Sequence, residues 1–164
     1  EWIKFGKPSG LGIVTGMVAG LGTITGAAGV VGPAGALVVG ILAGVICFFM
    51  TQLIKKTLKI DDSLDVFPVH GVGGILGTFL AGIFCSPNLG IFSGLGYAAG
   101  HDSIASQLSI QVTGIVVIGL YTAILTWVLL KLTSIITSGL RVNEDEEREG
   151  LDLIAHEERG YDIK

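Results

Sequence analysis

The chain has 164 residues, of which 50% are apolar and only 15% are charged, and its mean hydropathy is +0.73. This composition is too apolar for an ordinary soluble domain of that length, and it predicts a protein that lies in the lipid bilayer. A soluble helical protein would need charged residues at helical spacing, whereas the run from Leu11 to Ile54 contains no charged residue.

Four stretches are long and apolar enough to cross a bilayer as helices, which takes about 20 residues. In chain order they cover residues 9–28, 33–54, 66–85 and 104–137, and the last is long enough to span with tilt and protrude. The sequence therefore predicts an all-α membrane protein, with a bundle of four transmembrane helices in residues 1–138 and a cytoplasmic tail in residues 139–164.

Many of the 26 glycines lie inside these apolar stretches and recur at intervals of four. Such stripes are Gly12, Gly16 and Gly20, then Gly40 and Gly44, then Gly73 and Gly77. Glycines four residues apart form a smooth surface on one side of a helix, which allows a neighbouring backbone to approach closely. We expect these stripes to be helix–helix interfaces.

The basic residues lie in three segments. Lys4 and Lys7 precede the first stretch, Lys55, Lys56 and Lys59 lie between the second and the third, and the others start at Lys131. With four spans these three segments fall on one side of the membrane, and the positive-inside rule identifies that side as the cytoplasm. Both ends of the chain are then cytoplasmic, and the loop of residues 86–103 is outside.

The tail changes composition abruptly, because the segment from Leu140 to the end carries nine acidic and four basic residues. Composition alone is typical of a disordered acidic tail. The alternative is a segment that docks with a cytoplasmic partner, and the residue pattern leaves both open.

His70 is the ionisable residue placed most clearly within a predicted span, and such residues are costly and often functional. A neutral imidazole has one donor and one acceptor, so it suits a proton relay or a small polar solute. A buried structural histidine explains the pattern equally well. Its depth depends on whether the helix begins near Asp65, or near Asp61 with a distortion at Pro68, and the aspartates here are expected mainly to cap the helix.

Other chemistry has little support in the sequence. The serines, threonines and aspartates do not form a nucleophile with its base, His and Cys form no metal-binding pattern, and the glycine runs are too deep in apolar sequence to cradle a phosphate. We therefore expect no enzyme, no metal or other cofactor, and no nucleic-acid partner.

The segment IDDSLDVFPVHGVGGILGTFLAGIF, residues 60–84, closely resembles the signature of the penultimate helix of ammonium transporters of the Amt/MEP group. GKPSGLGIVTGMVAGLGTITGAAG from Gly6 and GLRVNEDEEREGLD from Gly139 resemble an earlier helix and the start of the tail in the same family. The Rh branch usually has a second histidine where this chain has Gly73 and Gly74, so the Amt/MEP branch fits better.

This resemblance implies the last four of about eleven spans, in a fold with two inverted repeats and one pore in each subunit of a homotrimer. His70 matches the second histidine of the pore's histidine pair, Val66 and Thr25 match positions close to the pore, and Asp65 matches a structural acid at the helix mouth. Arg141, Arg148 and Gly150 match the regulatory tail, which in the family meets PII-type regulatory proteins.

The expected function is transport of ammonium or ammonia across the cell membrane through an apolar pore with a histidine relay, by a multi-pass protein whose C-terminus is cytoplasmic. The chain itself is expected to be a fragment that lacks the first half of the pore. Two alternatives are an ammonium sensor of the same fold and a fragment that inserts without conducting.

Overall fold

The computed structural model describes residues 2–160, and every regular element in that part of the chain is helical. The described residues form two compact units, which divide between residues 117 and 118. Three helical segments are long and apolar enough to cross a membrane, namely Pro33–Thr57, Phe67–Phe84 and Ile104–Ile136. The four expected stretches therefore correspond to these three segments and one shorter apolar helix.

The shorter helix is α2, Gly10–Thr25, which follows the single turn α1, Trp2–Phe5. The side chain of Ser9 caps it by accepting a hydrogen bond of 2.9 Å from the Gly12 N–H. The helix ends at Thr25 and continues as turns, so it is shorter than the expected 9–28. With 16 residues it is roughly 24 Å long, a little less than the hydrocarbon core of a typical bilayer.

The next span consists of α3, Pro33–Gln52, and the π-helical turn η1, Leu53–Thr57. The span after it begins with a second π-helical segment, η2, Phe67–Val72, and continues as α4, Gly73–Phe84. Pro33 is placed where a helix tolerates proline best, because the first helical N–H has no partner in the helix. π-helical turns are rare, and they occur often at functional sites.

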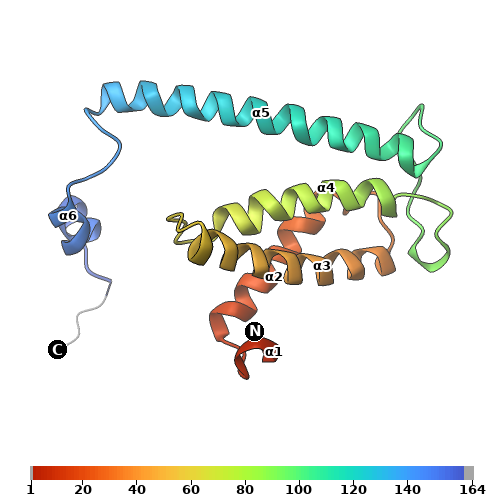
Figure 1. Cartoon of the computed structure of the whole chain (residues 1–164), viewed down its shortest axis with the longest axis horizontal. Helices are drawn as coiled ribbons and strands as arrows, with labels where there is room; N and C mark the ends of the chain where they lie inside the picture. The colour runs from red at the N-terminus through yellow and green to blue at the C-terminus, as the bar shows by residue number, and fades with distance from the viewer. Residues whose placement is uncertain (1, 161–164) are drawn as a thin grey trace. The chain divides into compact units, whose positions relative to one another are not determined.

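α2, α3 and α4 pack on one another and form the core of the first unit (Figure 1). Small and medium side chains fill the core, among them Ala19, Thr23, Ala43, Cys47 and Val69, each no more than 3% exposed. Small residues at a helix interface allow close backbone approach where the lipid provides no hydrophobic drive for association.

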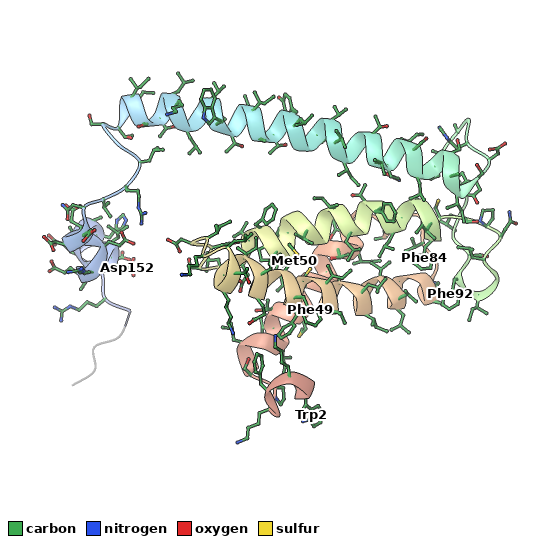
Figure 2. All side chains as sticks on the ribbon, in the orientation of Figure 1. Trp2, Phe49, Met50, Phe84, Phe92 and Asp152 are labelled. Atoms are coloured by element: carbon green, nitrogen blue, oxygen red, sulfur yellow. The ribbon has the colours of Figure 1, made fainter. Side chains whose placement is uncertain are left out.

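The loop after α4 contains the 3-10 turn η3, Gly90–Phe92, and folds back on the bundle. The Leu95 N–H donates to the Val30 carbonyl at 3.0 Å, and the Tyr97 hydroxyl donates to Ser86 Oγ at 2.7 Å. The rings of Phe84 and Phe92, both labelled in Figure 2, have centroids 6.4 Å apart. The loop thus closes this end of the bundle.

The long helix α5, Ile104–Ile136, begins in the first unit and continues into the second. After it come two short helices of the tail, α6, Glu144–Glu149, and α7, Leu151–His156. Asn143 and Glu146 form a capping box at the start of α6, in which each side chain accepts from the other residue's N–H.

Candidate functional site

In the first unit, α4 and α2 approach each other closely. Both Gly73 and Gly77 are buried there, and a Cβ atom at Gly73 would lie 2.8 Å from Thr23 Oγ1. At Gly77 a Cβ atom would overlap the carbonyl oxygen of Thr23. The two helices therefore meet at backbone contact, and this contact fixes the position of the turn that precedes α4.

That turn is η2, and it carries His70. A Cβ atom at Gly22 of α2 would lie 3.8 Å from His70 Nδ1 and 3.9 Å from the Val69 carbonyl oxygen. The imidazole therefore lies beside Gly22, while the residue as a whole is exposed in this chain. Among the described residues the ring has no hydrogen-bond partner, so both of its nitrogens are available to other groups.

The helix that carries His70 begins at Val66, immediately after Asp65, whose φ of 56° is left-handed. His70 is therefore little more than one turn inside the helix, and the alternative start near Asp61 is not what the structure has. Pro68 lies near the beginning of η2, where its missing N–H costs least.

Two aspartates organise the start of this helix. Asp62 accepts hydrogen bonds of 2.9 Å from the N–H groups of Val66 and Phe67, one on each carboxylate oxygen. Asp65 forms an ion pair of 2.8 Å with Lys55, which also donates to the Ser63 carbonyl at 3.3 Å. Asp62 thus satisfies N–H groups that the helix leaves free, while Lys55 ties the end of the preceding span to the connecting loop.

The two positions expected near the pore are also exposed. Val66 is 53% exposed and lies one turn before His70. Thr25 lies one turn after Gly22 on α2, and its hydroxyl donates to the Leu21 carbonyl at 2.7 Å within its own helix. On α2, the residue that the structure shows beside the His70 ring is Gly22.

Sequence reasoning did not identify Gly22 or Gly26 as neighbours of the histidine helix. A Cβ atom at Gly26 would lie 3.6 Å from Thr78 Oγ1. These glycines are four residues apart, so the spacing that indicated the stripe of Gly12, Gly16 and Gly20 marks them as a second stripe, but it does not indicate which helix packs there. In this chain a Cβ atom at Gly16 or Gly20 has open space around it, so these two positions have no close partner within the described residues.

The tail residues lie in the second unit and are organised locally. Arg141 forms an ion pair with Glu147 at 3.3 Å, and Arg148 pairs with Glu144 at 3.8 Å. Gly150 joins α6 to α7 with a φ of 99°, a backbone conformation that favours glycine. Within residues 2–160, no group of three or more His, Cys, Asp and Glu side chains has an arrangement that could hold a metal.

Comparisons with known proteins show what this chain is similar to. The model of the Ammonium Transporter Family matches residues 1–161. An ammonium transporter of Aquifex aeolicus is 44% identical over 99% of this chain, and one of Bacillus subtilis is 38% identical over 98%. A solved structure titled Sensor Amt Protein superimposes with a TM-score of 0.81 at 29% identity and covers 94% of the chain.

The fraction of each relative's own length that this chain covers is much smaller. The chain covers 37% of the Aquifex aeolicus protein, 39% of the Bacillus subtilis protein and 36% of the solved chain. It thus spans a little more than a third of their length. Together with the long apolar helices, the match over residues 1–161 shows that this chain is a multi-pass membrane protein and belongs to the ammonium transporter family.

Proposed function

We propose that the chain is part of a membrane protein that transports ammonium or ammonia, and that His70 lines the path of the solute. Family membership and two relatives named ammonium transporter support the substrate. One observation supports the proposed role of His70. Its ring lies beside Gly22, little more than one turn inside the helix that begins at Val66, in an exposed residue and without a hydrogen-bond partner among the described residues.

A polar ring in such a position is costly unless something uses it. Ammonium is strongly hydrated, whereas ammonia is neutral and small enough for a narrow apolar passage. An imidazole offers one donor and one acceptor, so it can hydrogen-bond either species or share a proton with a second imidazole. Val66, exposed and one turn from His70, supplies an apolar wall on the same side.

The second wall of such a path is proposed to come from the rest of the protein, since this chain spans only 37% of one relative. The open glycines Gly16 and Gly20 are proposed to pack against those further helices. On its own the chain is proposed not to conduct, because a path with one wall is open to lipid. The full protein is proposed to have about eleven spans in two inverted repeats and to form a homotrimer.

The orientation proposed for the chain has four spans and a cytoplasmic C-terminus in the cell membrane. The basic residues of the first unit support it, because Lys4 and Lys7 precede α2 while Lys55, Lys56 and Lys59 follow α3. The tail is then placed where it can meet a PII-type regulatory protein, with Arg141, Arg148 and Gly150 in the segment concerned.

A sensor is the second candidate, because a solved structure similar to this chain is titled Sensor Amt Protein. A sensor would bind ammonium without moving it at a useful rate. The two functions separate in one measurement, since a transporter gives time-dependent uptake of labelled methylammonium and a sensor gives only saturable binding.

The test uses the full-length protein in cells that lack their own ammonium transporters. We expect His70→Ala to reduce uptake at least ten-fold at equal abundance in the membrane, because the polar group is lost while a small residue fits beside Gly22. His156→Ala, a histidine replacement in the tail, should leave uptake unchanged. Unchanged uptake in the His70 variant would remove this residue from the path, and absence of uptake in the wild type would favour the sensor.

A further inference from the structure

Three aspartates lie in the connection between η1 and η2, and their carboxylates have different surroundings. Asp61 is exposed, so water can solvate it. Asp62 accepts from two backbone N–H groups at 2.9 Å each. Asp65 has neither kind of partner, because its side chain is only 18% exposed and no backbone N–H group of the described residues donates to it. The Asp65 carboxylate therefore depends on its ion pair with Lys55.

This ion pair joins Asp65 Oδ1 to Lys55 Nζ at 2.8 Å. Apart from it, the buried Oδ1 atom has no partner among the described residues. Lys55 Nζ is held by a second acceptor, because it also donates to the Ser63 carbonyl at 3.3 Å. A mostly buried carboxylate that loses its cation becomes an uncompensated charge, which is costly. One fixed ammonium group thus neutralises Asp65.

The pairing is selective among the lysines at this end of the span. Lys56 and Lys59 are exposed, and neither has a carboxylate partner in the part of the chain that the structure describes. Lys55 lies in η1, whereas Asp65 directly precedes the helix that carries His70. The pair therefore connects two successive spans.

The group that neutralises Asp65 belongs to the same chemical class as the proposed solute. Lys55 Nζ is a positively charged ammonium group with N–H donors, as are ammonium and methylammonium. Asp65 directly precedes Val66, which the proposed function assigns to the wall of the path, and it lies five residues before His70. Without Lys55, a carboxylate at this place would attract an ammonium ion, and the attraction increases where water is scarce. Neutral ammonia would not be attracted in this way.

We propose that Lys55 is a specificity-determining residue, which occupies Asp65 with a tethered ammonium group and so prevents a free ammonium ion from binding there. The inference rests on the proposed function, which places Val66 on the path. With the pair intact, the solute passes Asp65 without forming an ion pair. A pair that only held η1 to the histidine helix would behave differently, because loss of Lys55 would lower stability without creating a preference for an added cation.

The test uses the purified full-length protein and compares thermal unfolding in ammonium chloride with unfolding in sodium chloride of equal concentration. We expect Lys55→Ala to unfold at a lower temperature than the wild type in sodium chloride, because Asp65 is unpaired. Ammonium chloride should reverse part of this loss in a saturable way, by binding where Nζ was. Lys55→Gln keeps more of the side chain, and it should show the same pattern if the alanine variant is not stable enough to purify.

A double variant, Lys55→Ala with Asp65→Asn, removes both charges, and asparagine tolerates the left-handed φ of 56° at that position. It should show no more stabilisation by ammonium than the wild type does. Lys56→Ala is the matched control, because it removes a neighbouring lysine of η1 that has no carboxylate partner among the described residues. Equal recovery in sodium chloride, or ammonium recovery of the same size in the double variant or in Lys56→Ala, would overturn the proposal.

Uptake of labelled methylammonium gives a second readout. Lys55→Ala should lower both the half-saturating concentration and the maximal rate about five-fold, as expected for one additional ion pair with the solute. The double variant should return both values toward those of the wild type. A lower maximal rate with an unchanged half-saturating concentration would make the pair purely structural. Absence of uptake in the wild type would refute the proposed transport alone, because the unfolding measurements would still show whether ammonium replaces Lys55.

Discussion

The carbonyl oxygen of Thr23 occupies the space that a Cβ atom at Gly77 would need. Thr23 is fully buried on α2 and Gly77 is buried on α4, so the two backbones touch at this point. His70 lies two turns before Gly77 along the chain, and its ring lies beside Gly22, the residue just before Thr23. The contact that brings the helices together therefore also determines where the histidine lies.

Replacement of Gly77 by alanine should separate α4 from α2. Because the added methyl group meets backbone rather than a flexible side chain, we expect a loss of about 1–3 kcal/mol in the free energy of unfolding. Thermal unfolding of the purified full-length protein measures this loss, and uptake should fall with it because the turn carrying His70 is displaced.

Gly74 is the matched control for this change, since it is the neighbouring glycine on α4 and an added Cβ atom has open space in this chain. Gly74→Ala should be neutral, or more stable by up to about 1 kcal/mol because alanine favours a helix. Equal losses in the two variants would mean that the contact with Thr23 is not what holds the helices together.

Removal of the Asp62 carboxylate should weaken the start of the histidine helix. The N–H groups of Val66 and Phe67 would lose their acceptors, and we expect Asp62→Ala to cost about 1 kcal/mol. Hydrogen exchange at these two amides, followed by mass spectrometry, should become faster in the variant.

Asp61→Ala serves as the control, because Asp61 is exposed and has no hydrogen bond or ion pair to any other described residue. Its effect on exchange at Val66 and Phe67 should be small. If both variants speed exchange equally, the general negative charge near the helix start matters rather than the two bonds of Asp62.

The sequence was sufficient for those features that depend on residues near one another in the chain. Apolar length predicted the all-helical membrane fold, and the aspartates before Val66 indicated a capped helix start. Gly22 could not be paired with His70 in this way, because periodicity assigns a face to each helix but not the neighbour of that face. The end of α2 at Thr25 could not be predicted either. Residues 26–28 form turns, but they are all apolar or small, as the residues of the helix are.

The proposed orientation, with four spans and a cytoplasmic tail, predicts that Asp102 lies outside the cell. The natural cysteines of this chain help the test, since Cys47 is 2% exposed and Cys85 is 3% exposed. In a full-length protein without other cysteines, Asp102→Cys should react with a membrane-impermeant maleimide on intact cells. Glu144→Cys should react only after the cells are made permeable, and the reverse pattern would invert the proposed orientation.

The tail should be ordered around its two short helices although its composition is strongly acidic. Each helix has a local reason to form, since Asn143 and Glu146 cap α6 and Gly150 permits the change of direction before α7. The apolar side chains Leu140, Val142, Leu151, Leu153 and Ile154 are all between 37% and 53% exposed. An ordered segment with such a surface is suited to a partner, whereas an inert acidic extension needs no apolar residues.

Deletion of the residues after Gly139 should therefore change activity or its regulation while the membrane spans remain. Under the proposed function, we expect methylammonium uptake to fall, or its shutdown after an ammonium pulse to disappear, at equal protein abundance in the membrane. Gly150→Ala is the finer variant, because a φ of 99° strains any residue with a Cβ atom and should disturb α7 without removing it. Gly160→Ala, beyond both helices and without a neighbour within 4 Å of an added Cβ atom, is its control. If the truncated protein transports normally and still shuts down after the pulse, the tail has no role in transport or its control, and its apolar residues serve only its own two helices.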